Sequence, residues 1–269
     1  MKETGRQANR YAMLLEHVFD KHFKPGSREV IFEREEFLDA AATLNIKIPK
    51  NLGDLIYSFR YRVPLPQSIV DRAPDGEYWI IRPAGSGRYK FEATNLPPIA
   101  PNPTLAETKI PDSTPGLIAK YALSDEQALL ARLRYNRLLD IFLGITTYSL
   151  QNHLRTQVPE FGQLETDEVY VGLDKRGIHY VLPVQAKGGA DQQSFVQIES
   201  DIAMCAHKFP DMICRPIAAQ FMHDDVIALF AFENGDDRIS ILSEKHYRLV
   251  APSEVSREDL AMYQIRPED

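Results

Sequence analysis

Two polar residues end an apolar, strand-like run, and an acidic cluster occupies the run before it. In the stretch YVLPVQAKGG, Gln185 and Lys187 alternate with apolar residues, so both lie on one face of the predicted strand. A short turn, DKRG, joins this strand to the preceding run LETDEVYV, and the two runs predict a hairpin. Pairing then brings three acidic residues beside Gln185 and Lys187: Glu165, Asp167 and Glu168.

The donor atoms of this cluster indicate its chemistry. Carboxylate and amide oxygens are the hard ligands that Mg²⁺ prefers, and the ion takes one or two protein carboxylates while keeping several waters. A lysine beside such an ion helps to neutralise a phosphodiester during in-line attack by water. Carboxylates also explain the lysine, because a buried ammonium group is costly without a partner. The pattern therefore predicts a magnesium site for phosphodiester hydrolysis.

The order Asp167 … Gln185-Ala186-Lys187 resembles the PD-(D/E)XK nuclease core, in which one strand carries the aspartate and its hairpin mate carries (D/E)-x-K. Phrases through most of the chain, such as NLGDLIYSFRYR, RYNRLLDIF, YSLQNHLRT and HYVLPVQAKGG, are similar to bacterial restriction-endonuclease-like proteins. The resemblance implies that Asp167 binds the metal and that Gln185 replaces the second metal-binding acid. It also implies that Lys187 orients or polarises the attacking water.

Gln185 departs from the family pattern, which usually has Asp or Glu there. Because an amide oxygen brings no charge, Glu165 or Glu168 is expected to compensate, with Glu168 as a further metal ligand. Two glutamines match supporting polar positions of the family. Gln197 lies in the helix predicted after the motif, and Gln151 lies in a helix predicted over TTYSLQNHLRTQV, where many relatives place a glutamate.

Residues 1–94 have the element order of a winged helix, namely helix, strand, helix, helix and hairpin. The third helix, ending in YSFRYR, would be the recognition helix, and the hairpin over GEYWIIRPAGSGRYKFEA would be the wing. Arginine suits both phosphates and guanine edges. In the alternative, the domain docks proteins, the aromatic residues are core and the arginines form a solvated face. The residues expected to face double-stranded DNA are Tyr57, Arg60, Tyr61, Arg62, Arg82, Arg88 and Lys90.

A segment over 95–116 with six prolines separates this domain from residues 117–269. Prolines disfavour regular helix and central strand, so the segment is expected to be a linker or an extended strap. Beyond it, LSDEQALLARLRYNRLLDIFLG predicts one helix that ends at Gly144. The order helix, helix, hairpin, helix and strands predicts an α/β (α+β) domain with a mixed sheet, and the resemblance implies a restriction-endonuclease-like core.

Composition bounds the protein class. The 269 residues are 44% hydrophobic, enough for one large or two smaller domains, and no apolar run is long enough to span a membrane. The N-terminus has no apolar signal core, which favours a cytoplasmic location. The net charge of −7 is uneven, with 15 Lys and Arg against 13 Asp and Glu in residues 1–96, and 16 against 25 in residues 97–269. The acidic half is either a solvated surface or a site for a cation.

These patterns predict a Mg²⁺-dependent DNA endonuclease, specifically a type II restriction enzyme that acts on foreign double-stranded DNA. Cleavage of both strands of a palindrome would require a homodimer with twofold symmetry. Two alternatives remain open. One is a non-catalytic DNA-binding regulator with a degenerate nuclease fold, and the other is a repair nuclease that recognises DNA structure.

Overall fold

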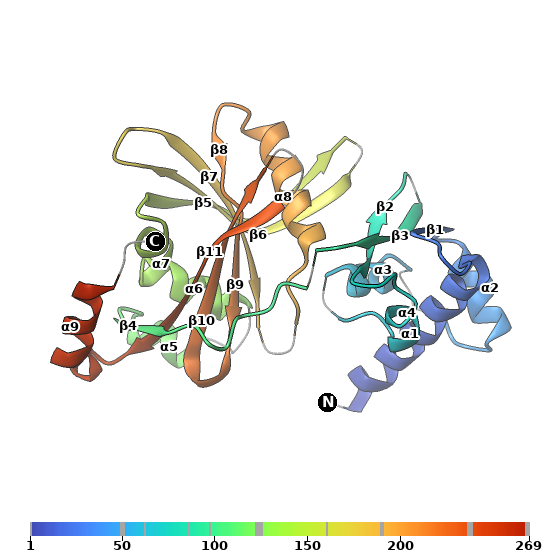
Figure 1. Cartoon of the computed structure of the whole chain (residues 1–269), viewed down its shortest axis with the longest axis horizontal. Coiled ribbons are helices and arrows are strands. Elements are labelled where there is room, and N and C mark those ends of the chain that lie inside the picture. The colour runs from blue at the N-terminus through green and yellow to red at the C-terminus, as the bar shows by residue number, and fades with distance from the viewer. Residues whose placement is uncertain are drawn as a thin grey trace. The chain divides into compact units, whose positions relative to one another are not determined.

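The chain forms two compact units, which are described separately. A computed structural model describes residues 2–48, 52–61, 63–85, 87–96, 98–121, 126–159, 161–188, 191–235 and 239–266. The N-terminal unit comprises Met1–Ile99, Pro159–Gly162 and Ser194–Gln197, and the C-terminal unit comprises Ala100–Val158, Gln163–Gln193 and Ile198–Asp269. Both units combine helices with a β-sheet (Figure 1).

The N-terminal unit has a three-stranded antiparallel sheet in the order β1-β3-β2. The predicted order of helix, strand, helix, helix and hairpin is confirmed, with one short additional helix before the hairpin. Its core is aromatic, and the ring of Phe19 meets those of Phe91 and Trp79 edge-on at 4.9 and 5.6 Å between centroids. Its elements are α1 (Lys2–His22), β1 (Glu29–Glu33), α2 (Glu36–Thr43), α3 (Leu52–Tyr61), α4 (Gln67–Val70), β2 (Tyr78–Pro83) and β3 (Arg88–Thr94).

The C-terminal unit is built on a mixed sheet, as the sequence predicts, and this sheet has eight strands. The strand order is β4-β11-β10-β9-β7-β6-β5, and β8 pairs with β7. The pairs β7–β9, β7–β8 and β11–β4 are parallel, whereas β6–β7, β9–β10 and β10–β11 are antiparallel. The strands are β4 (Glu107–Pro111), β5 (Thr146–Val158), β6 (Gly162–Leu173), β7 (His179–Lys187), β8 (Ile213–Cys214), β9 (Ile217–Phe221), β10 (Val226–Asn234) and β11 (Ile239–Val250).

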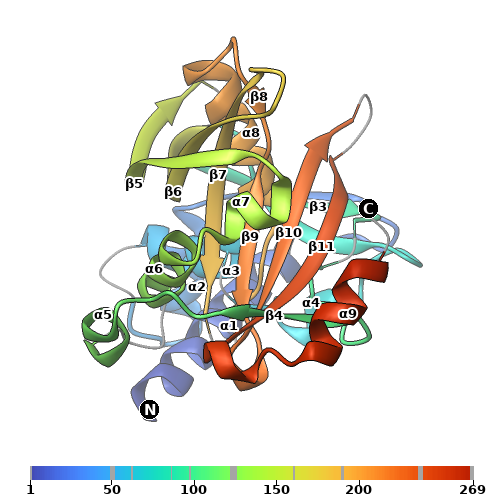
Figure 2. The same ribbon diagram turned by 90° about the vertical axis from the view of Figure 1, so that its left-hand side faces the viewer.

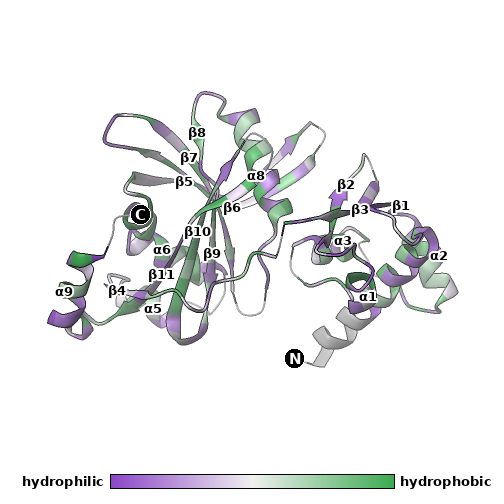
Figure 3. Ribbon diagram, viewed as in Figure 1, coloured by the Kyte–Doolittle hydropathy of each residue, from purple (hydrophilic) through white to green (hydrophobic). Residues whose placement is uncertain are grey.

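Helices cover both faces of this sheet. Figure 2 shows α6 and α7 in front of the strands and α8 behind them. The main core cluster joins leucines of α6 and α7 to every second residue of β7, including Leu182, Val184 and Ala186. Figure 3 shows the apolar colour along the central strand β10, whose first seven residues are buried. The helices are α5 (Gly116–Tyr121), α6 (Glu126–Tyr135), α7 (Leu138–Leu143), α8 (Phe195–Lys208) and α9 (Arg257–Ile265).

Two predicted elements are wrong. TTYSLQNHLRTQV is not a helix but the edge strand β5, and its leucines at a spacing of four imitate a helical face. The single helix predicted up to Gly144 is two helices, broken where Arg137 adopts a left-handed conformation with φ 49°. The buried Asn136 at this break binds the backbone N–H of Ser113 at 2.6 Å, which ties the helix end to the proline-rich segment.

The proline-rich segment is largely extended, as expected, but it also contributes a strand. β4 pairs in parallel with β11 at the edge of the sheet, where a proline costs no interior ladder bond. No helix among the described residues has the length and apolar character needed to cross a membrane.

Candidate active site at the end of the hairpin

The predicted hairpin forms, and its two strands separate at Asp167. Regular pairing of β6 with β7 extends from Leu173 opposite His179 to Glu168 opposite Val184. Beyond that pair, the side chain of Asp167 accepts the backbone N–H of Ala186, with 2.8 Å between Oδ2 and N. The carboxylate therefore occupies a place in the ladder where a backbone carbonyl would stand, and this fixes the acid against the end of β7.

Lys187 provides the positive charge of this site. Its side chain is only 2% exposed, and its Nζ lies 3.5 Å from Oε1 of Glu126, the first residue of α6. Burial raises the pKa of Asp167 above its usual value, while the charge of Lys187 and the hydrogen bond from Ala186 oppose that rise. The cluster of Glu126, Asp167 and Lys187, called the acid–lysine cluster below, thus joins the start of α6 to the two strands of the hairpin.

Gln185 is bonded to an acid that the sequence did not predict here. Its amide Nε2 donates to both oxygens of Asp201 in α8, at 3.1 and 3.0 Å, and lies 3.4 Å from the backbone carbonyl of Glu165. Asp201 also accepts the hydroxyl of Thr166 at 2.6 Å. Gln185 and Asp201 are each 1% exposed, and burial raises the pKa of Asp201 to about 7. A fourth acid, unforeseen in the sequence, therefore lies directly beside the motif.

Asp201→Asn is expected to remove a pH dependence of stability. In the unfolded chain Asp201 has the ordinary aspartate pKa of 3.8 and is ionised between about pH 4 and pH 7. In the folded wild type its carboxyl group keeps the proton over the same range. The free energy of unfolding of wild type should fall across this range, by up to about 4 kcal/mol relative to Asp201→Asn, and level off above it. Urea denaturation between pH 4.5 and 8.5 measures the difference. The exposed Asp211→Asn serves as the control and should follow wild type, and parallel curves for wild type and Asp201→Asn would contradict the prediction.

The structure does not bring Glu168 into the acid–lysine cluster. Its Oε1 accepts Nε and Nη2 of Arg134 at 3.2 and 2.8 Å, together with the hydroxyl of Ser149. Arg134 lies on α6, whereas Thr166 binds Asp201 on α8, which covers the other face of the sheet (Figures 1 and 2). Residues two apart in a regular strand share a face, so β6 is irregular around Asp167.

Glu165 is also held elsewhere. Its Oε1 lies 3.2 Å from Nη2 of Arg155 and 3.8 Å from Nδ1 of His153, and its side chain is 28% exposed. The convergence of three carboxylates predicted at the hairpin end is therefore wrong. Within the described ranges, no group of three His, Cys, Asp or Glu residues is arranged to hold a metal ion.

The two supporting glutamines lie in different surroundings. Gln151 is exposed on β5, where it lines a pocket of about 220 Å³ with Lys208 and Phe209, so its predicted helical position is wrong. Gln197 lies in the first turn of α8, as predicted, and is 6% exposed. It is grouped with the N-terminal unit.

Several of the predicted DNA-facing cations have acidic partners. Arg82 lies 3.4 Å from Glu92, and Nζ of Lys90 lies 2.6 Å from Glu92 and 2.9 Å from Glu29. Arg88 is exposed at the start of β3.

On α3, the guanidinium of Arg60 lies over the buried ring of Tyr61 at 4.6 Å, and Tyr57 stacks edge-on with the same ring. Arg62 lies outside the described residues. The tyrosines of α3 thus serve packing, and only part of the basic set extends into solvent.

Sequence reasoning missed two residues of the site, Glu126 and Asp201. Glu126 has the signal of a first-turn acid, which the helix dipole alone also explains. Asp201 lies in α8, the helix that follows Gln185 in sequence, and the residue pattern of α8 is that of an ordinary amphipathic helix. Comparison with known proteins gives no family, since no family model, curated protein or solved structure matches this chain.

Proposed function

We propose that this protein is a Mg²⁺-dependent nuclease that hydrolyses phosphodiester bonds of double-stranded DNA. In this proposal residues 117–269 form a restriction-endonuclease-like domain, and residues 1–94 form a winged-helix-like domain that binds DNA. The observation that carries it is the acid–lysine cluster, in which a lysine with 2% exposure is held against Glu126 and beside Asp167 at the end of a hairpin. A structural ion pair alone gives little reason to bury a lysine so deeply.

The donor set fits a magnesium ion. Mg²⁺ binds through one or two carboxylates and keeps its remaining ligands as water, which matches Glu126 and Asp167 without a third acid. The raised pKa of Asp167 supports this fit, because burial leaves its negative charge incompletely balanced by Lys187. The amide nitrogen of Gln185 faces Asp201, so the group that Gln185 can offer an ion is its carbonyl oxygen.

Each residue then has a role in hydrolysis. When bound, Mg²⁺ would supply positive charge at the phosphate and acidify a water molecule. Lys187 is placed to orient the attacking water and to neutralise charge that develops on the phosphate oxygens. Glu126 holds Lys187 in position, the charge of Lys187 acts on Asp167, and Asp201 holds the amide of Gln185. Because uncatalysed phosphodiester hydrolysis is extremely slow, this preorganised charge has to supply most of the acceleration.

Biologically, we place the enzyme in the restriction of foreign DNA, as a type II endonuclease that acts as a homodimer in the cytoplasm. The alternative with specific support is a non-catalytic DNA-binding regulator. Gln185 favours it, because this residue is bonded into a buried network with Asp201 and Thr166 where an active site would have a charged ligand. A repair nuclease specific for DNA structure is a third proposal, and it would leave no fixed fragment pattern.

Cleavage of unmethylated plasmid and phage DNA with Mg²⁺ or EDTA tests the proposal, with Glu126→Gln beside wild type. Wild type should give discrete fragments in Mg²⁺ only, and Glu126→Gln should slow cleavage by about 10²–10³-fold through the loss of one charged group. Glu258→Gln, which changes an exposed acid in the first turn of α9, is the matched control and should cut like wild type. DNA binding without cleavage by wild type would support the regulator, and cleavage that persists in EDTA would contradict the metal.

A further inference from the structure

Hydrolysis of a phosphodiester is faster when a side chain accepts a proton from the attacking water. An ammonium group donates and has no lone pair, so Lys187 can orient this water but cannot take its proton. Glu126 and Asp167 are the acids assigned to the ion. Burial raises the pKa of Asp201 to about 7, and the oxygens of this acid already hold the amide of Gln185. A proton acceptor beside the acid–lysine cluster would complete the set.

His153 on β5 lies beside the cluster. Its Nε2 is 3.0 Å from Nε2 of Gln127, the residue that follows Glu126 in the first turn of α6. Burial raises the pKa of Asp167, whereas the charges of Lys187 and His153 lower it, so the imidazole acts on the carboxylate of the cluster. The side chain of His153 is 53% exposed. The ring is therefore open to solvent and within electrostatic reach of the cluster.

The partners of His153 select one form of its neutral ring. An amide nitrogen only donates, so Nε2 of the imidazole accepts from Gln127 and has its lone pair directed to the start of α6. The other nitrogen, Nδ1, then carries the proton and faces Oε1 of Glu165 at 3.8 Å. Arg155 holds the same oxygen at 3.2 Å. A lone pair directed toward the cluster and a carboxylate behind the opposite nitrogen are the arrangement of a general base with an orienting acid.

The backbone of His153 supports a functional role for this residue. Its φ is 47°, a left-handed conformation within the edge strand β5 that residues other than glycine seldom adopt. Such positions persist where the surrounding structure imposes them, and they gather at active sites. The strained residue of β5 is thus also the one whose imidazole lies beside the acid–lysine cluster.

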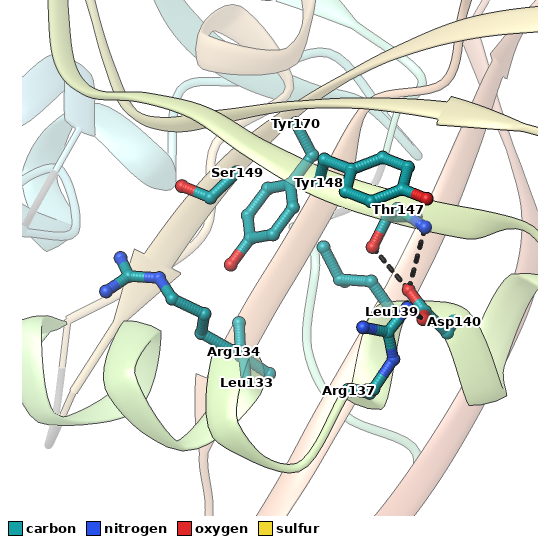
Figure 4. A pocket seen from close by; sticks show the side chains of 9 residues that line it. All are labelled: Leu133, Arg134, Arg137, Leu139, Asp140, Thr147, Tyr148, Ser149 and Tyr170. Atoms are coloured by element: carbon teal, nitrogen blue, oxygen red, sulfur yellow. Dashed lines mark hydrogen bonds and ion pairs between the residues drawn. The ribbon is translucent and has the colours of Figure 1, made fainter.

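The start of β5 has different surroundings. Its residues line a pocket of about 270 Å³ together with residues of α6 and α7 (Figure 4). The two arginines of this pocket form ion pairs with carboxylates. Arg134 pairs with Glu168. Arg137 pairs with Asp140. These pairs join the helices and strands of the core, whereas the imidazole of His153 is exposed.

We propose that His153 is a general base of the nuclease, and this inference rests on the proposed hydrolysis of DNA. Water beside Lys187 gives a proton to Nε2 of His153 in place of the exposed amide of Gln127. The water oxygen forms the new bond to phosphorus and the bond from phosphorus to the sugar oxygen breaks. The sugar oxygen leaves with the electron pair and takes a proton from solvent. The imidazolium, facing the carboxylate of Glu165, then returns its proton to water.

His153→Asn tests the base, because asparagine adopts a left-handed backbone readily and its amide is not basic. The rate constant for cleavage of a supercoiled plasmid that wild type cuts is measured with Mg²⁺ at saturating enzyme. It should fall by about 10²-fold or more, the usual contribution of a general base, while DNA binding in EDTA changes little. His179→Asn is the matched control and should cut like wild type. It changes an exposed histidine at the start of β7, at the far end of the hairpin.

His153→Gly separates a base from a structural role. Glycine fits the left-handed backbone and leaves space for a free ring, so added imidazole should restore the rate of this variant several-fold and leave wild type unchanged. Cleavage by His153→Asn at the wild-type rate overturns the base and leaves the proposed function standing. A slow His153→Gly protein that imidazole does not restore has the same meaning. Absence of cleavage by wild type overturns both.

Discussion

Lys187→Ala is expected to reduce Mg²⁺-dependent cleavage of DNA by about 10³-fold or more. The substitution removes the buried cation that lies 3.5 Å from Glu126 and acts on Asp167, and with it the positive charge placed to orient water and to balance charge on the phosphate. The rate constant for conversion of supercoiled plasmid, measured at saturating enzyme, gives the effect on the chemical step. DNA binding, measured in EDTA, should change little.

The matched control for this prediction is Lys175→Ala. Lys175 is exposed in the turn between β6 and β7, at the far end of the same hairpin, and its removal should leave the rate unchanged. Because Lys187→Ala leaves two acids without their buried partner, its thermal unfolding has to be recorded beside the rate. A folded Lys187→Ala protein that still cuts at the wild-type rate would exclude Lys187 from catalysis and, with it, the proposed site.

Arg134→Ala is expected to lower the free energy of unfolding by about 3 kcal/mol. The change strands the carboxylate of Glu168, which is 0% exposed, and breaking a buried pair in this way costs about 3–5 kcal/mol. We expect the low end because the side chain of Arg134 is 38% exposed and water can enter after its removal. Urea denaturation at pH 7 measures the loss.

Two further variants isolate the cause of that loss. Arg132→Ala, on the same helix, removes a partner of Asp225, whose side chain is 73% exposed, and should cost less than about 1 kcal/mol. Adding Glu168→Gln to Arg134→Ala removes the stranded charge and should recover part of the stability. Equal losses for Arg132→Ala and Arg134→Ala would mean that the buried pair contributes no more than a surface contact.

Local patterns in the sequence determined the central hairpin and the order of elements before it. Alternation in LETDEVYV and YVLPVQAKGG, with a turn between them, correctly predicts β6 and β7, because a half-buried strand needs side chains of period two whatever its neighbours are. The helix after the motif and the helix–strand–helix–helix–hairpin order of the N-terminal unit follow in the same way. Lys187 and Asp167 could therefore be assigned to neighbouring strands from their spacing.

Tertiary structure alone decided which acids meet at the end of that hairpin. Glu126 and Asp201 reach the site from α6 and α8, while the adjacent Glu168 lies in the regular part of β6 and faces Arg134 on α6. Tertiary structure also decided that β5 is a strand. Its apolar residues have the spacing of a helix, and its place beside β6 in the sheet makes it a strand. The physical reason is common to these cases. A side chain's direction and a strand's hydrogen bonds depend on partners distant in sequence, and no local pattern records them.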